Sequence, residues 1–393
     1  MTSATKQRVR VTFQPEGRTV HVLAGSLLLE AAGRAGIVLD TPCGGQGTCG
    51  KCRVLIRQNA PAPGEADRRH FSEKELQRGV RLACQTRAAA DMIVEVPAGA
   101  RLFEQRILTE GQGREVELEP TVAKYAVNLP EPSLEDQRAD ADRLIETIGE
   151  DLDVPRHVLA ALPDFFRRHP DGLTAVVAEG CIISLEAGDT TDRNYGIAFD
   201  IGTTTVAGFL MDLHAGREIA VAARTNPQVA YGDDVVARIK HASGNPDGLQ
   251  ELQARVVACL NEIVAECCDK TDIACEHLYE ATIAGNTTMN HLLLAVNPTY
   301  VAQAPYVAVL RRPMNVRASE LGLRIHPHGL VHSLPNVAGF VGSDTIGVIL
   351  SAGIHEAKKP VLAVDIGTNG ELVLGHRDRI IACSTAAGPA FEG

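Results

Sequence analysis

Four cysteines near the start of the chain have the residue type and spacing to hold an iron–sulfur cluster. Three lie close together and the fourth follows much later: Cys43, Cys49, Cys52 and Cys84. A two-iron two-sulfur cluster is held by four thiolates, and one compact loop with a distant fourth ligand suits it. Glycines alternate with the first three cysteines, at positions 44, 45, 47 and 50. Glycine lets such a loop enter left-handed conformations and bring its N–H groups near sulfur. The sequence therefore predicts a 2Fe–2S centre with these four cysteines as ligands.

The elements around this loop form a short alternating pattern. Arg8–Phe13 and Thr19–Leu23 alternate with period two and predict a hairpin. Ser26 is expected to cap a helix over 27–35, and Ser72 with Glu75 forms the pattern of a capping box. Further strands follow Cys52 and flank Cys84. This arrangement resembles the β-grasp fold of ferredoxins, and we expect it to occupy residues 1–97.

A second group of chemically competent residues lies at the ends of two apolar strands. The first strand ends in Asp200, Gly202, Thr203 and Thr204, and the second in Asp365, Gly367, Thr368 and Asn369. An aspartate at such a turn can hold Mg²⁺, usually through water. The glycine lets the backbone approach an oxyanion, and threonine hydroxyls and N–H groups donate to phosphate oxygens. Two copies predict a pair of similar lobes that grip a nucleotide from both sides.

The region between these two sites carries no obvious chemistry. We expect a helix over 131–149, a second helix over 154–166 and strands over 173–185. The other six cysteines lack the spacing of a second cluster and are interpreted as buried structural thiols. They are Cys181, Cys259, Cys267, Cys268, Cys275 and Cys383. His291 is interpreted as a hydrogen-bonded core residue.

Composition narrows the class of protein. The chain has 393 residues, of which 45% are hydrophobic, enough for two or three domains. The N-terminus has no apolar signal region and no apolar run reaches membrane-spanning length, so we expect a cytoplasmic protein. The net charge is −11, yet residues 1–95 carry 14 Lys and Arg against 9 Asp and Glu. This basic segment is either a solvated surface or a docking face for acidic redox partners. Nothing predicts nucleic-acid binding.

The two hairpins resemble the phosphate motifs of the ASKHA superfamily, which includes sugar kinases, heat-shock chaperones and actin. A ferredoxin domain fused to this fold is similar to the reductive activators of corrinoid proteins, which use ATP to drive an electron onto cobalt. Four further segments resemble that family: Tyr231–Val235, Ala284–Met289, Ala338–Asp344 and Cys383–Gly393.

The resemblance implies a multidomain α+β and α/β fold. We expect a β-grasp ferredoxin domain at 1–97, a small linking domain at 98–190 and a ribonuclease-H-like ASKHA lobe at 191–360. The start of a second lobe would occupy 361–393. Relatives continue beyond this point, so we expect a C-terminally truncated chain. Its activity as an activase would then require the missing lobe, and its ATP and Mg²⁺ binding would depend on an intact form.

The resemblance also implies roles for residues. The four cysteines would ligate the cluster, Asp200 and Asp365 would serve the phosphate chemistry, and the neighbouring glycines, threonines and Asn369 would bind nucleotide. Asn286 is interpreted either as a turn amide or as a group beside the phosphate ligands. Asp344 is interpreted as the N-cap of a helix over 345–350 rather than as such a group.

The implied function is reduction of a corrinoid protein of a methyltransferase system from cobalt(II) to cobalt(I), with electrons from a cellular donor. A homodimer is compatible with it. One alternative is a plain 2Fe–2S electron carrier whose C-terminal domain binds a partner. Another is a nucleotide-dependent kinase or chaperone in which the cluster is a sensor.

Overall fold

The computed structural model describes the chain except residues 1–7, 16, 36, 38, 40, 42–44, 98–99, 101–117, 233, 368–369 and 386–393. Among the predicted site residues, Cys43, Thr368 and Asn369 therefore lie outside the described residues. The chain divides into two compact units, built mainly from Met1–Glu110 and from Gly111–Asn226 with Ile239–Ala387. In the described part of the chain, no helix is long and apolar enough to cross a membrane.

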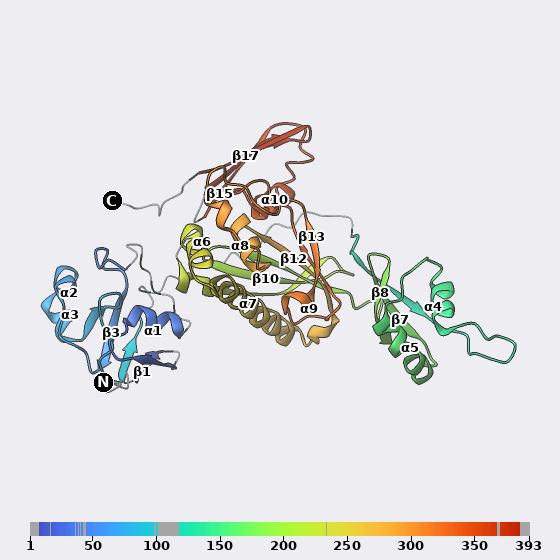
Figure 1. Ribbon diagram of the computed structural model, residues 1–393, viewed down its shortest axis with the longest axis horizontal. Helices are drawn as coiled ribbons and strands as arrows, with labels where there is room; N and C mark the ends of the chain where they lie inside the picture. The colour runs from blue at the N-terminus through green and yellow to red at the C-terminus, as the bar shows by residue number, and fades with distance from the viewer. Residues whose placement is uncertain are drawn as a thin grey trace. The chain divides into compact units, whose positions relative to one another are not determined.

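The N-terminal unit, drawn in blue to cyan in Figure 1, contains a five-stranded sheet. The strand order is β2-β1-β5-β3-β4. β1 and β2 form the predicted antiparallel hairpin, while β1 and β5 run parallel. Alternate residues of β1, namely Val9, Val11 and Phe13, enter a core shared with α1. The predicted β-grasp fold is confirmed. Its elements are β1 (Arg8–Gln14), β2 (Arg18–Leu23), α1 (Leu28–Arg34), β3 (Arg53–Gln58), α2 (Glu65–His70), α3 (Glu73–Gln77), β4 (Val80–Leu82) and β5 (Met92–Glu95).

The two predicted helix caps in this unit have different outcomes. Ser72 is the N-cap of α3 and forms the expected capping box, in which Glu75 Oε2 accepts the Ser72 N–H at 2.8 Å and also the Ser72 hydroxyl at 2.7 Å. The prediction for Ser26 is wrong: Leu27 occupies the N-cap of α1 and no side chain caps the helix. Leu27 instead forms an isolated bridge with Arg87, and the Leu28 N–H donates to the Thr86 carbonyl. The long-range pairing fixes where this helix begins.

The second unit begins with a small domain of three antiparallel strands and two helices. Buried residues from both helices and from β7 share one core, among them Leu144, Leu162 and Leu173. Gly149 ends the first helix in a left-handed conformation, with φ at +82°. The elements are β6 (Val122–Val127), α4 (Asp140–Ile148), α5 (Arg156–Arg168), β7 (Leu173–Ala178) and β8 (Cys181–Ala187).

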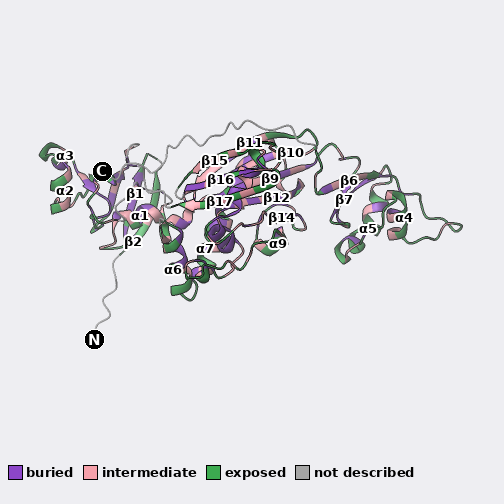
Figure 2. Cartoon of the chain, turned by 90° about the horizontal axis from the view of Figure 1, so that it is seen from above, coloured by how far each residue is buried: buried purple, intermediate pink, exposed green. Residues whose placement is uncertain are grey.

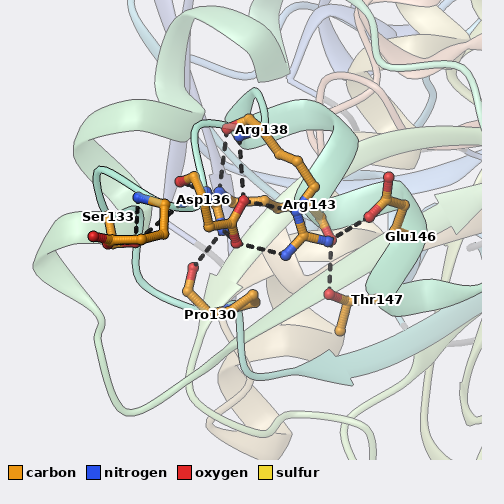
Figure 3. A network of polar contacts seen from close by, with 8 residues as sticks. Pro130, Ser133, Asp136, Arg138, Arg143, Glu146 and Thr147 are labelled. Atoms are coloured by element: carbon orange, nitrogen blue, oxygen red, sulfur yellow. Dashed lines mark hydrogen bonds and ion pairs between the residues drawn. The ribbon is translucent and has the colours of Figure 1, made fainter.

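The predicted helix over 131–149 is wrong in its first half, because residues 131–139 form a loop. The Ser133 hydroxyl accepts the N–H groups of Glu135 and Asp136, and the fully buried Arg143 donates to the backbone carbonyl of Asp136. Arg143 also donates to the Pro130 and Arg138 carbonyls and pairs with the Asp136 carboxylate at 2.6 Å (Figure 3). Side chains thus satisfy backbone groups that a helix would have paired internally.

The main lobe contains a six-stranded sheet in the order β11-β10-β9-β12-β14-β13. β9, β10 and β11 pair antiparallel, and β12 then runs parallel to both β9 and β14. α7 packs on β10 and β11, and the central strands carry many buried residues (Figure 2). This is the expected ribonuclease-H-like lobe.

The strands of the lobe are β9 (Tyr195–Ile201), β10 (Thr205–Asp212), β11 (Arg217–Thr225), β12 (Leu278–Gly285), β13 (Met314–Arg317) and β14 (Leu330–Ser333). The helices are α6 (Val235–Gly244), α7 (Gly248–Thr271), α8 (Thr287–Leu293), α9 (Ala318–Leu321) and α10 (Ser343–Ser351). The short 3-10 helices of the lobe are η3 (Cys275–His277) and η4 (Thr299–Val301), whereas η2 (Pro227–Tyr231) and the first residues of α6 (235–238) group with the N-terminal unit.

A buried carboxylate joins the small domain to this lobe. Glu186 on β8 accepts from Lys124 Nζ at 2.7 Å and from the Tyr279 hydroxyl of β12 at 2.8 Å. Burial alone would raise the pKa of Glu186, but hydrogen bonds from Lys124 and Thr190 lower it overall. The Lys124 and Glu186 side chains are only 2% and 7% exposed. Glu186 therefore connects β6 and β8 of the small domain to β12 of the lobe, through its ion pair with Lys124 and its hydrogen bond from Tyr279.

The last three strands form a separate antiparallel sheet in the order β15-β16-β17. Alternate residues Leu362, Val364 and Ile366 of β15 are exposed, while Val361 and Ala363 pack toward α10. On β17 the same alternation exposes Cys383, so the buried-thiol prediction is wrong for that residue. Cys259, Cys267 and Cys268 are buried as predicted, and Cys181 and Cys275 are half-buried. The strands are β15 (Val361–Ile366), β16 (Gly370–His376) and β17 (Arg379–Thr385).

Candidate metal centre and candidate nucleotide site

Three of the four predicted ligand cysteines converge in the N-terminal unit. Cys52 and Cys84 are 1% and 2% exposed, and Cys49 is half-buried. The Ala83 N–H donates to the Cys52 carbonyl at 2.9 Å, which places the start of β3 beside the end of β4. A hydrogen bond with Cys84, together with burial, raises the pKa of the Cys52 thiol, and the nearby Cys49 adds to this effect. Thiols that are buried so close together lose their protons only when a metal cation binds them.

The loop that carries Cys49 depends on glycine. Gly45, Gly47 and Gly50 all have positive φ, at +83°, +74° and +70°. A Cβ at Gly47 would lie 2.9 Å from Gln85 Cγ, and a Cβ at Gly50 would lie 2.9 Å from His70 Nδ1. Both conformation and space therefore require glycine at these two positions.

Three described thiols lie in or beside one glycine-rich loop and at the end of β4, a donor set that suits a two-iron cluster. A 2Fe–2S cluster has two irons bridged by sulfide, so its ligands bind at two separate points. Buried thiols in a glycine-rich loop match that chemistry.

The predicted phosphate residues of the main lobe lie at the turn between β9 and β10. Asp200 is near the end of β9, and Gly202, Thr203 and Thr204 form the turn. A Cβ at Gly202 would lie 2.7 Å from the Thr205 carbonyl oxygen, so a larger residue would displace the backbone. Thr203 is 5% exposed.

Two asparagines hold this turn in place. Asn226 is fully buried; its side chain donates to the Gly202 carbonyl at 2.8 Å, and its N–H donates to the Thr204 carbonyl at 2.8 Å. Asn286 donates to Thr203 Oγ1 at 2.9 Å and caps α8 by accepting the Met289 N–H at 3.0 Å. Asn286 is therefore both a cap and a direct contact of a predicted phosphate residue. Sequence reasoning missed Asn226, because its role depends on a distant backbone carbonyl.

Four carboxylates from separate elements influence one another electrostatically. Desolvation by the surrounding protein raises the pKa of Asp200 to about 6, and the charges of Asp344 and Asp365 contribute to this rise, although the residue is exposed at the surface. Burial, Asp344 and Asp365 raise the pKa of Glu371 to about 7, and burial chiefly raises that of Asp344. A cation bound near these carboxylates would relieve this repulsion and lower their pKa values.

The structure corrects one interpretation here and adds one residue to the site. Gly342, not Asp344, is the N-cap of α10, and Asp344 lies in the first turn with its carboxylate accepting the Thr345 N–H at 2.7 Å. The charge of Asp344 instead raises the pKa of Asp200, one of the two predicted aspartates. Glu371 was not singled out from the sequence. Its position just after the second turn, directly opposite Asp365 in the β15–β16 pairing, is a signal that could have found it.

The second predicted phosphate turn follows β15. Asp365 lies at the end of this strand, and Gly367 lies just beyond it and is exposed. His291 is fully buried, with Nδ1 donating to the Thr287 carbonyl at 2.7 Å and Nε2 accepting the Val309 N–H at 3.1 Å. His291 is thus the satisfied core residue that was expected.

Known domain families match the chain in sequence order. A 2Fe-2S iron-sulfur cluster binding domain matches residues 11–89, and the RACo linker region matches 111–192. The RACo middle region matches 195–357, and the C-terminal domain of RACo, the ASKHA domain, matches 359–393. Over most of residues 111–393 this chain is similar to RACo proteins, region by region. The predicted fusion of a ferredoxin-type domain to an ASKHA fold is confirmed.

Individual relatives agree with this assignment. The corrinoid activation enzyme RamQ of Eubacterium limosum is 32% identical over 388 residues, which is 98% of this chain and 62% of RamQ. A solved structure titled as a reductive activator for a corrinoid, iron-sulfur protein is 35% identical with a TM-score of 0.67, covering 98% of this chain and 64% of that one. This chain thus spans less than two thirds of both relatives.

The cluster domain has a second kind of relative. A component of the Na(+)-translocating NADH-quinone reductase of Chlamydia caviae is 44% identical over 78 residues, or 20% of this chain and 18% of that protein. The match to the 2Fe-2S iron-sulfur cluster binding domain supports a 2Fe–2S cluster in this chain.

Proposed function

We propose that this chain carries the electron-transfer and nucleotide-binding parts of an ATP-dependent reductive activator of a corrinoid protein. The observation that carries the proposal is the joint presence of a buried thiol site and a carboxylate-lined phosphate turn in one chain that is similar to RACo proteins. The chain would accept one electron from a cellular donor and pass it to cobalt(II) of the corrinoid, giving cobalt(I).

Cys43, Cys49, Cys52 and Cys84 would hold the 2Fe–2S cluster, which supplies one-electron capacity. Burial of Cys52 and Cys84 supports their part in this assignment, since it keeps water from the centre. Asp200 and Asp365 would hold Mg²⁺, and Gly202, Thr203, Thr204, Gly367, Thr368 and Asn369 would bind the phosphates of ATP.

ATP is needed because the electron must move uphill in potential. For a one-electron transfer, a tenfold bias corresponds to about 59 mV, so a coupling free energy of about 4 kcal/mol shifts the equilibrium by about 180 mV. Differential binding of the corrinoid protein in two nucleotide states can supply this amount. The donor, a homodimeric assembly and a cytoplasmic location stay predictions.

The test measures ATP dependence directly. The chain is first joined to the C-terminal part of RamQ, so that the fusion has the length of that relative. The fusion is then mixed with a chemical reductant and a cobalt(II) corrinoid protein. Cobalt(I) absorbance should appear only with MgATP. Equal reduction without ATP would favour the plain electron carrier instead, and ATP turnover with no electron transfer would favour the kinase or chaperone alternative.

A further inference from the structure

Helix α2 contacts the loop that carries Cys49 through His70. The His70 Nε2 atom lies 3.0 Å from the Gly47 carbonyl oxygen, and because a carbonyl only accepts, the ring donates from this nitrogen. The same ring packs on Gly50, where a Cβ would lie 2.9 Å from Nδ1. One imidazole therefore covers both glycines that flank Cys49.

The same helix contacts the segment that carries Cys84 through Asp67. Asp67 is 3% exposed, and its Oδ1 atom accepts the N–H of Leu82, two residues before Cys84, at 2.8 Å. Its Oδ2 atom accepts the Gly64 N–H at 2.8 Å, which fixes the start of α2. A buried carboxylate with two backbone donors is held firmly in one orientation.

Two further contacts close the space between these segments. A Cβ at Gly47 would lie 3.3 Å from the Ala66 Cβ of α2, so the helix packs directly on the loop. Gln85, next to Cys84, donates from Nε2 to the Gly45 carbonyl at 2.7 Å. The loop and the fourth-cysteine segment are thus joined both directly and through α2.

We propose that α2 is a clip that sets the separation between the loop that carries Cys49 and the segment that carries Cys84, with Asp67 and His70 as positioning residues for the cluster. The clip acts on the backbone on either side of two of the predicted ligands. The proposal rests on the ligand assignment made above. Groups that orient metal ligands in this way commonly change metal affinity 10- to 100-fold when removed, by order of magnitude.

The test uses His70→Ala in the full chain with its cluster loaded. Iron release to a chelator should be about tenfold faster than in the parent chain, and the electron paramagnetic resonance signal of the reduced cluster should change. His70→Gln, whose amide can donate to the same carbonyl, should restore much of both. Arg69→Ala on the same helix is the matched control, because the Arg69 side chain is 66% exposed and pairs only with Glu65 among the contacts described.

Asp67→Asn provides a second variant that keeps the side-chain volume. Its amide nitrogen would face a backbone N–H, so this chain should also release iron faster than the Arg69→Ala control. Unchanged release and an unchanged spectrum in both His70→Ala and Asp67→Asn would overturn the clip. If Cys49→Ser keeps a full cluster, the ligand assignment itself is wrong; loss of the cluster there with unchanged clip variants refutes the clip alone.

Discussion

Glu371 is expected to make the protein less stable as pH rises. Its side chain is 7% exposed, lies opposite Asp365 in the β15–β16 pairing, and accepts a 3.4 Å hydrogen bond from Ser384. Burial and the charges of Asp344 and Asp365 raise its pKa from 4.5 to about 7. The unfolded chain therefore loses this proton at lower pH than the folded chain does. Stability contributed by the protonated group is full below pH 4.5 and falls as pH rises to about 7.

The size of the effect follows from the shift. One pKa unit corresponds to about 1.36 kcal/mol, so ionised Glu371 costs up to about 3 kcal/mol at about pH 8. Glu371→Gln removes the charge and keeps the volume and the acceptor oxygen. The variant should be more stable than the parent at about pH 8 by roughly one to three kcal/mol. The difference should vanish near pH 4, where the parent glutamate is protonated.

The assay is urea unfolding followed by circular dichroism between about pH 4 and pH 8. Glu218→Gln on β11 is the matched control, because Glu218 is exposed and the substitution should change stability little at any pH. A Glu371→Gln gain that is the same at both ends of this range, or no gain at all, would refute the electrostatic account of this site.

Three further predictions concern the cluster, the phosphate turn and the domain junction. Cys49→Ser should lose most iron and sulfide, because a hydroxyl is a poor iron ligand, whereas the parent should hold about two of each; four irons per chain would contradict this. Asn226→Ala should remove the side-chain donor to the half-buried Gly202 carbonyl, destabilise the fold by about 1–3 kcal/mol and weaken nucleotide binding measured by calorimetry; unchanged binding would contradict it. Lys124→Met should leave Glu186 buried without its cation and cost about 3–5 kcal/mol in urea unfolding, whereas a neutral effect would show that Glu186 finds another partner.

Local patterns explain what could be predicted from the sequence. Cys49 and Cys52 lie in a glycine-rich loop whose residue types and spacing can be recognised locally, and the turn at Asp200 follows from an apolar strand and a short polar segment. Ser72 capped its helix as expected, since the partner Glu75 is three residues away. Such features need no knowledge of the rest of the fold.

Features set by distant contacts could not be predicted in this way. Leu27 begins α1 because it bridges Arg87, which overrides the capping tendency of Ser26. The loop before α4 escapes the helix because the buried Arg143 side chain takes up its carbonyls. Glu371 and Asn226 join the phosphate site only through strand pairing and through a carbonyl far away in sequence.

The measurement that tests the central claim most directly is ATP-dependent formation of cobalt(I). The chain joined to the C-terminal part of RamQ is compared with the Asp365→Ala variant of the same fusion. Each protein carries a reduced cluster and is mixed with a cobalt(II) corrinoid protein and MgATP. We predict that cobalt(I) absorbance appears with ATP, is lost in Asp365→Ala, and that the cluster spectrum is the same in both. Cobalt(I) formed equally well without ATP, or undiminished in Asp365→Ala, would contradict the account.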